Sequence, residues 1–258
     1  MTDADAVAAA QAHQARFDEL WDFDDPAASE ARFLEAADPK PGIQRDVFLT
    51  QYARAAGLQG RHAEALVILD SLESADAEVR VRVLLESGRV LNSSGKAGKA
   101  RPLFEQAFAA ASAAGLEFLA IDALHMLAIV APAAEQPELL ERAIAMAESA
   151  SDPRAREWLA SLLNNYGWTR FDAGQHVEAL ALFERALVER ERKGGAAGPI
   201  RVARWCVART LRELGRVEEA LAMQRQLAAA HAAAGTSDTY VDEEIAACEA
   251  ALASTSQA

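Results

Sequence analysis

The residues in this sequence that could do chemistry are suited to recognition rather than to catalysis. Arg54, Arg89, Trp168 and Arg209 each lie six residues before a glycine, so one position recurs along the chain. Guanidinium groups bind carboxylates through paired hydrogen bonds, and tryptophan rings bind apolar side chains. Together with residues at helical spacing beside this position, they form a candidate binding set: Arg54, Arg82, Arg89, His125, Asn164, Asn165, Trp168, Trp205 and Arg209.

Motifs for catalysis are absent from the sequence. It contains no glycine-rich phosphate loop, nucleophile elbow or paired-histidine metal signature. The segment SSGKAGKA (93–100) contains Gly-Lys, but it lacks the first glycine and the preceding strand of a phosphate loop. The segment WDFDD (21–25) could be a metal or acidic docking site, although a capped turn between helices also explains it. We therefore expect no enzymatic activity, no cofactor and no bound metal.

Pairs of amphipathic helices must position the candidate set. In residues 157–192, Gly174 separates two helical patterns of apolar residues. The small residues Gly167 and Ala179 allow these two helices to approach closely, with Phe183 filling the space between them. The same order of a glycine followed by small and large apolar residues recurs at three other places: Gly60, Gly95 and Gly215.

This pattern resembles the tetratricopeptide repeat, a helix-turn-helix unit of about 34 residues. A degenerate unit, in which Pro132 and Pro137 replace the turn glycine, joins the regular units into one array. The resemblance implies an all-α, right-handed superhelix of helix pairs that forms a single solenoid over residues 1–258. It also implies that the first helix of each pair lines a concave, peptide-binding groove, and that the candidate set faces this groove.

About 13 helices are expected. An atypical, acidic pair occupies residues 1–38, with Asp25 as N-cap and Pro26 at the first helical position, and covers the first regular repeat. Repeats fill residues 43–234, and a polar-backed helix over 237–253 closes the last apolar face. Within the repeats, helices are expected over 43–57, 61–74, 77–94, 97–114, 117–131, 135–149, 153–173, 175–193, 199–214 and 217–234.

Composition limits the class of partner. The 26 basic and 39 acidic residues give a net charge of −13, which disfavours nucleic acid as a ligand. No apolar run reaches the roughly 18 residues of a membrane span, and no leader-like segment opens the chain, so we expect a soluble, cytoplasmic protein with no membrane partner. Cys206 and Cys248 are expected to be buried thiols in a reducing compartment, with a disulfide as the alternative.

Two functions without catalysis fit these residues. In the first, the groove holds an extended, acidic segment of a protein or peptide. Its backbone would pair with the asparagines, its carboxylates with the arginines, and an apolar side chain with the tryptophans. In the second, the chain is a self-assembly module, such as a homodimer, with no groove ligand. A structural role is the alternative at each position: tryptophans packed between repeats, an interior histidine, asparagines at helix ends, and arginines in ordinary ion pairs.

Overall fold

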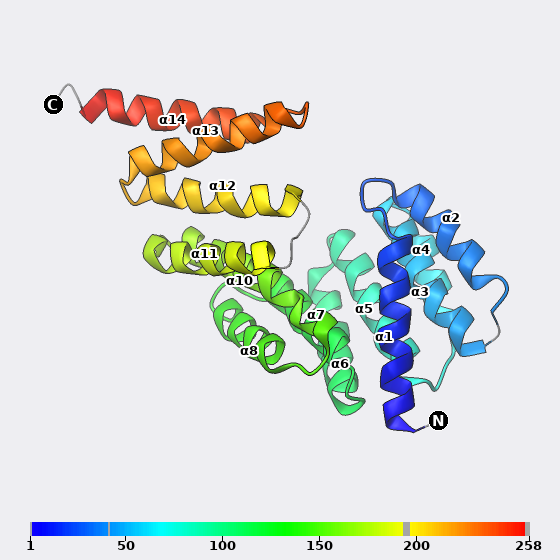
Figure 1. Cartoon of the computed structure of the whole chain (residues 1–258). Helices are drawn as coiled ribbons and strands as arrows, with labels where there is room; N and C mark the ends of the chain where they lie inside the picture. Colours follow the sequence, from blue (N-terminus) through cyan, green and yellow to red (C-terminus); the bar gives the residue numbers. More distant parts are fainter. Residues whose placement is uncertain (1, 41, 193–196, 256–258) are drawn as a thin grey trace. The chain divides into compact units, whose positions relative to one another are not determined.

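The computed structural model describes residues 2–40, 42–192 and 197–255, and every regular element in these ranges is an α-helix (Figure 1). The expected all-α class is therefore confirmed. None of the helices in these ranges is both long enough and apolar enough to cross a membrane. The helices are α1 (Asp3–Leu20), α2 (Pro26–Ala37), α3 (Gly42–Leu58), α4 (His62–Asp70), α5 (Ala77–Ser93), α6 (Ala97–Ala113), α7 (Glu117–Val130), α8 (Gln136–Ser149), α9 (Pro153–Arg156), α10 (Trp158–Asp172), α11 (His176–Arg192), α12 (Ala197–Glu213), α13 (Val217–Ala233) and α14 (Thr239–Thr255).

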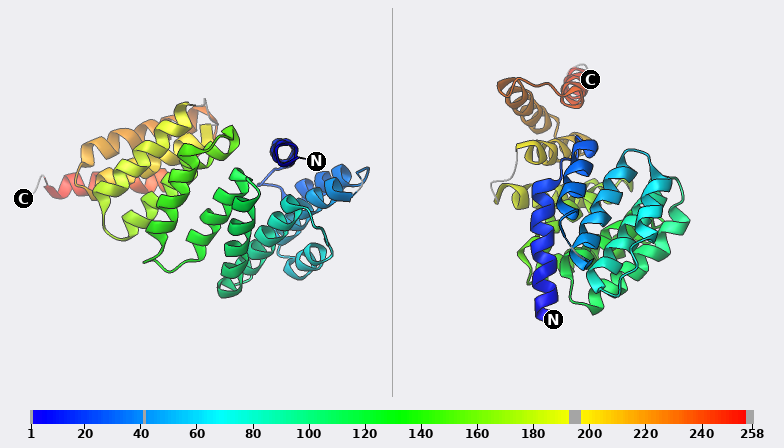
Figure 2. Two further views of the ribbon diagram at one scale, coloured as in Figure 1. Left: turned by 90° about the horizontal axis from the view of Figure 1, so that it is seen from below. Right: turned by 90° about the vertical axis from the view of Figure 1, so that its right-hand side faces the viewer.

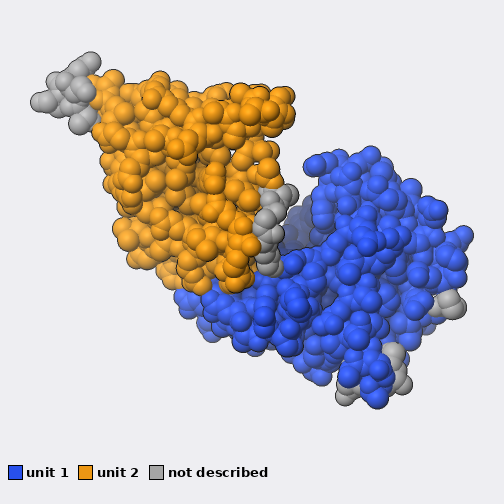
Figure 3. Space-filling model, viewed as in Figure 1, with its two compact units in different colours: residues 1–158 blue, residues 159–258 orange. Residues whose placement is uncertain are grey.

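The chain divides into two compact units (Figure 3). Unit 1 is Met1–Trp158 and unit 2 is Leu159–Ala258. Within each unit, successive helices lie side by side, as Figure 2 shows for α11 to α14 and for α5 to α7. The expectation of one continuous solenoid over the whole chain remains a prediction.

Glycines end the first helix of each regular pair, as the sequence predicts. Gly60, Gly95, Gly174 and Gly215 have φ angles of 79°, 78°, 73° and 77°, a left-handed conformation that favours glycine. The residue after each glycine donates to the carbonyl oxygen five positions earlier, which is the Schellman ending of a helix. This hydrogen bond turns the chain back, so that the second helix packs against the first.

Close packing of the two helices in a pair depends on a second kind of glycine. A Cβ atom at Gly167 in α10 would lie 2.5 Å from the ring of Phe183 in α11. Phe183 is completely buried, and Ala179 is buried beside it. The predicted roles of all three residues in this helix pair are therefore confirmed.

Apart from shifts of one or two residues at helix ends, the helices differ from the prediction at two places. The expected helix 153–173 is two helices, because the N–H of Glu157 bonds to the carbonyl of Arg154, three residues back, and breaks the regular ladder. The chain therefore has fourteen helices in its described ranges rather than 13. Helix α4 ends at Asp70 rather than at residue 74. Directly after its last residue, the hydroxyl of Ser71 donates to the carbonyl oxygen of Ile68 (2.6 Å).

The N-terminal pair begins as predicted, but its first helix has an unexpected position. Asp25 accepts a hydrogen bond from the N–H of Ala28 (2.9 Å), and Pro26 opens α2. Helix α1 crosses α3 and α5, with Phe17 packed edge-to-face on Phe48 of α3 at 5.3 Å between ring centres (Figure 1). Helix α1 thus covers part of the face formed by α3 and α5, each of which is the first helix of its pair.

Candidate ligand-binding pockets

Unit 1 contains a pocket of about 460 Å³ on the face of α3, α5 and α7. Helix α1 and the segment after it contribute to its wall on one side, and α9 with Trp158 on another. Four aromatic rings line it: Trp21, Phe23, Phe118 and Trp158. Its charged lining consists of four arginines and three carboxylates: Arg54, Arg82, Arg89 and Arg154, with Asp18, Glu86 and Asp122. Three predicted arginines therefore meet at one site.

Glu86 of α5 lies at the centre of the ion pairs in this pocket. Its Oε1 lies 2.7 Å from Arg89 and 3.7 Å from Arg54, and it accepts a hydrogen bond from Gln51 (3.3 Å). Its Oε2 is buried without a hydrogen-bond partner among the described residues. Arg89 also pairs with Asp122 of α7. Although burial alone would raise it, Arg89 holds the pKa of Asp122 below its ordinary value.

Arg54 is the least neutralised arginine of this ion-pair network. Its one ion pair among the described residues is the 3.7 Å contact to Glu86, which Arg89 shares at a shorter distance. Its guanidinium lies 5.4 Å from the ring centres of Trp21 and Phe23. Burial and repulsion from Arg89 lower the pKa of Arg54. An added carboxylate beside Arg54 would therefore be attracted to a cation that the chain itself compensates poorly.

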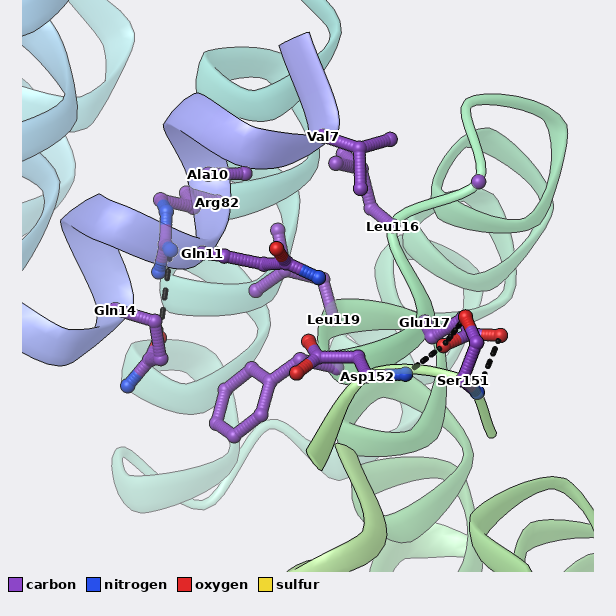
Figure 4. A pocket seen from close by; sticks show the side chains of 12 residues that line it. Val7, Ala10, Gln11, Gln14, Arg82, Leu116, Glu117, Leu119, Ser151 and Asp152 are labelled. Atoms are coloured by element: carbon purple, nitrogen blue, oxygen red, sulfur yellow. Dashed lines mark hydrogen bonds between the residues drawn. The ribbon is translucent and has the colours of Figure 1, made fainter. Parts of the chain in front are cut away.

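Arg82, in contrast, is covered by α1. The sequence analysis placed it on an outward face, yet the structure leaves only 3 % of it exposed. It forms an ion pair with Glu78 (2.8 Å) and donates to Gln14 of α1 (3.3 Å), and its guanidinium lies over the ring of Phe17. Figure 4 shows the contact with Gln14 beside a smaller pocket of about 140 Å³ between α1 and the start of α7. The sequence analysis did not place α1 on this face, so it did not predict that α1 would bury Arg82.

His125 is not among the residues that line the unit 1 pocket, but its ring centre lies 5.0 Å from that of Trp158, which does line it. Burial lowers the pKa of His125, which favours the neutral imidazole. The indole N–H of Trp158 and the Nε of Arg154 are buried and have no hydrogen-bond partner in the described part of the chain. The wall near α9 therefore holds two unused donors, and Glu86 holds one unused acceptor.

The predicted tryptophans of unit 2 pack against one another and against aromatic neighbours. Trp168 lies 5.1 Å from Phe171, 5.2 Å from Phe183 and 6.1 Å from Trp205, measured between ring centres. The indole N–H of Trp205 donates to the carbonyl oxygen of Tyr240 (3.3 Å). These contacts join α10, α11, α12 and α14 and give both tryptophans a packing role.

The other predicted residues of unit 2 also have contacts within it. Arg209 of α12 forms an ion pair with Glu244 of α14 (2.7 Å). The side-chain oxygen of Asn164 lies 3.6 Å from the thiol of Cys206, and half-buried Asn165 follows it on α10. Cys206 and Cys248 are both free and buried, as predicted. Participation of the candidate residues in binding a partner remains a prediction.

No protein-family model and no curated protein sequence matches this chain. Several solved structures have a similar fold. A kinesin light chain of Podosopora anserina with nearly identical TPR-like repeats aligns with a TM-score of 0.59 and 19 % identity over 72 % of this chain and 94 % of that one. The apo quorum sensor NprR of B. thuringiensis aligns with a TM-score of 0.59 and 16 % identity over 87 % of this chain and 64 % of that one. A Rap protein in complex with competence and sporulation factor aligns with a TM-score of 0.58 and 13 % identity over 78 % of this chain and 58 % of that one.

The chain has a tetratricopeptide-type helical repeat fold. In three of the repeats of this chain, the arginine six residues before the turn glycine forms an ion pair with an acidic residue of a later helix: Arg54 with Glu86, Arg89 with Asp122 and Arg209 with Glu244. The sequence analysis missed these acidic partners, although each lies about one repeat length beyond its arginine. Among the described residues, no cluster of three or more His, Cys, Asp or Glu side chains could hold a metal ion.

Proposed function

We propose that this chain is a binding scaffold whose unit 1 pocket anchors an extended, acidic segment of a protein or peptide. The observation that carries the proposal is the lining of the pocket, which combines arginines and aromatic rings on the first-helix face of the repeats. Arginine and tryptophan are the side chains that most often dominate the free energy of protein–protein binding. Neighbours of similar fold include a Rap protein in complex with competence and sporulation factor.

The polar groups of the pocket suit a peptide. The unused N–H groups of Arg154 and Trp158 would donate to a carbonyl oxygen of the peptide, and the free oxygen of Glu86 would accept from a backbone N–H. All three atoms are buried, so side chains must move before a bound segment can reach them. A carboxylate of the same segment would lie beside Arg54, against the rings of Trp21 and Phe23.

Selection from a displayed peptide library with the full chain, followed by anisotropy titrations of labelled synthetic peptides, tests this proposal. Arg54→Gln removes the least neutralised cation while keeping the ion pair between Arg89 and Asp122. We expect this variant to bind the selected acidic peptide at least tenfold more weakly, because a charge-assisted hydrogen bond contributes about 1.5–3 kcal/mol. Wild-type affinity should also fall as salt rises.

The matched control is Arg80→Gln, which removes an exposed arginine from α5, the helix that carries Glu86. It should bind the peptide as the wild type does. Failure to select any acidic sequence, or equal losses in the two variants, would contradict the proposal. Light scattering of the same samples addresses the alternative, since a self-assembly module would form oligomers without peptide.

A further inference from the structure

Unit 2 contains a second pocket, of about 410 Å³, which lies where the start of α12, the end of α13 and the start of α14 meet. Its walls are largely apolar and include Val202, Trp205, Tyr240 and Val241. Val202 and Tyr240 expose 56 % and 66 % of their surface, so the pocket is open to solvent. A pocket of this size with apolar walls is typical of small-molecule sites.

One charge in this pocket lacks a counterpart. Arg201 lines the pocket, its Nε is buried without a hydrogen-bond partner, and it forms no ion pair with any described residue. The pocket's acidic residue is already engaged: Asp238 accepts from the N–H of Tyr240 (3.0 Å) and lies 3.7 Å from His231. His231 in turn contacts the hydroxyl of Thr236 (3.0 Å). The pocket therefore offers an uncompensated cation beside apolar walls.

The polar atom of the Trp205 side chain is already used. The indole N–H of Trp205 is used by the carbonyl oxygen of Tyr240, and the two rings lie edge-to-face at 6.2 Å between centres. The side of Trp205 that contacts Trp168 belongs to the core of unit 2. Trp205 therefore offers a ligand only ring surface, which binds apolar groups and excludes water.

We infer that this pocket binds a small apolar anion, namely a carboxylate carried on an aromatic or branched hydrocarbon group. The hydrocarbon lies against Val202, Trp205 and Tyr240, and the carboxylate forms a charge-assisted hydrogen bond with Arg201. This site is separate from the unit 1 pocket and shares no lining residue with it. Its ligand can therefore be tested without the peptide.

Two fluorescent probes with the same ring skeleton isolate the charge: the anionic 8-anilinonaphthalene-1-sulfonate and the uncharged N-phenyl-1-naphthylamine. Both should bind the full chain. Arg201→Gln should weaken binding of the anionic probe about tenfold or more, the effect expected for loss of a charge-assisted hydrogen bond, and leave the neutral probe within about twofold. Tyr240→Ala should weaken both probes, and its exposure makes the folded state tolerant of the change.

Arg204→Gln is the matched control, because Arg204 lies on the same helix but pairs with Glu191 and does not line the pocket. It should leave both probes unaffected. The branched 4-methylpentanoate and the aromatic 3-phenylpropionate are then added as competitors, and displacement of the anionic probe by either assigns the pocket to carboxylates of that hydrocarbon type. The inference is overturned if neither probe binds, if Arg201→Gln affects both probes equally, or if neither carboxylate competes.

Discussion

A methyl group on Gly88 would lie 2.4 Å from Cε1 of Phe104, far inside the van der Waals contact distance. The same relationship, sixteen residues apart in the sequence, holds between Gly167 and Phe183 at 2.5 Å. In both helix pairs a completely buried phenyl ring therefore lies directly on bare backbone. Glycine is required at these positions by the distance between the helices rather than by a positive φ angle.

Gly167→Ala should destabilise the protein. The added methyl group must push the ring of Phe183 or separate α10 from α11, at a cost of about 1–3 kcal/mol. This exceeds the gain of about 1 kcal/mol from replacing glycine by alanine inside a helix. We expect urea denaturation to show a lower free energy of unfolding, with the loss of structure beginning in unit 2.

Gly98→Ala is the control for this substitution. Gly98 also lies in a helix, α6, but nothing surrounds its Cβ position within 4 Å. The variant should be as stable as the wild type or more stable, by up to about 1 kcal/mol. Equal stability of the two alanine variants would show that close helix packing does not restrict Gly167.

At the equivalent positions of the other two regular repeats, the first helix has a larger residue and the second helix a smaller one. Alanine replaces glycine at Ala53 and Ala208, and the residues sixteen positions later are Leu69 and Gln224 rather than phenylalanine. Ala53 and Leu69 are buried in one cluster. Gln224 is completely buried, and neither polar atom of its amide has a hydrogen-bond partner among the described residues.

Gln224→Leu should therefore stabilise unit 2. It removes two buried polar atoms whose unmet hydrogen bonds cost about 1–3 kcal/mol, while keeping a side chain of similar volume. Gln224→Phe should instead destabilise it, because the methyl group of Ala208 occupies the space that a ring needs. Adding Ala208→Gly should recover stability in a double-mutant cycle. Simple additivity of the two changes would contradict this account of the packing.

The parts of this structure that could be predicted from the sequence are those set by neighbouring residues. Helical periodicity and glycine turns predict the helix pairs, because both depend on residues a few positions apart. The position of α1 depends on contacts such as that between His13 and Glu78, 65 residues apart, which no local pattern encodes. For the same reason Arg54 and Arg89 could be found from their spacing, whereas the cover over Arg82 could not.

Arg89→Gln should be strongly destabilising, in contrast to the small effect expected for an outward-facing arginine. Arg89 is the cation between Glu86 and Asp122, and all three side chains are largely buried. Its loss leaves two buried carboxylates poorly compensated, and breaking a buried pair in this way costs about 3–5 kcal/mol. Thermal and urea denaturation should both show this loss.

Arg225→Gln provides the surface comparison, since Arg225 and Glu249 are more than half exposed. It should change the free energy of unfolding by less than about 1 kcal/mol. Combining Arg89→Gln with Asp122→Asn should recover part of the stability by removing one uncompensated charge. If Arg89→Gln and Arg225→Gln were equally stable, the ion pairs of the unit 1 pocket would have no structural role.

Acid should release α1 from unit 1. Although burial alone would raise it, Arg82 and His13 hold the pKa of Glu78 below its ordinary value of 4.5. A carboxylate whose pKa is lower in the folded state stabilises that state fully above the unfolded pKa, and this stabilisation is lost as pH falls through the folded pKa. We therefore expect the contact between α1 and α5 to persist at pH 7 and to weaken below about pH 4.5. Hydrogen exchange of the α1 amides, corrected for the intrinsic effect of pH, measures this change.

Glu78→Gln separates the charge of Glu78 from the shape of the contact. Glutamine keeps the volume of the side chain but cannot form the ion pair with Arg82, so α1 should exchange faster than in the wild type already at pH 7. Because the titrating group is gone, the further acceleration between pH 7 and pH 3.5 should be smaller than in the wild type. Identical pH dependence in the two proteins would show that Glu78 does not control the docking of α1.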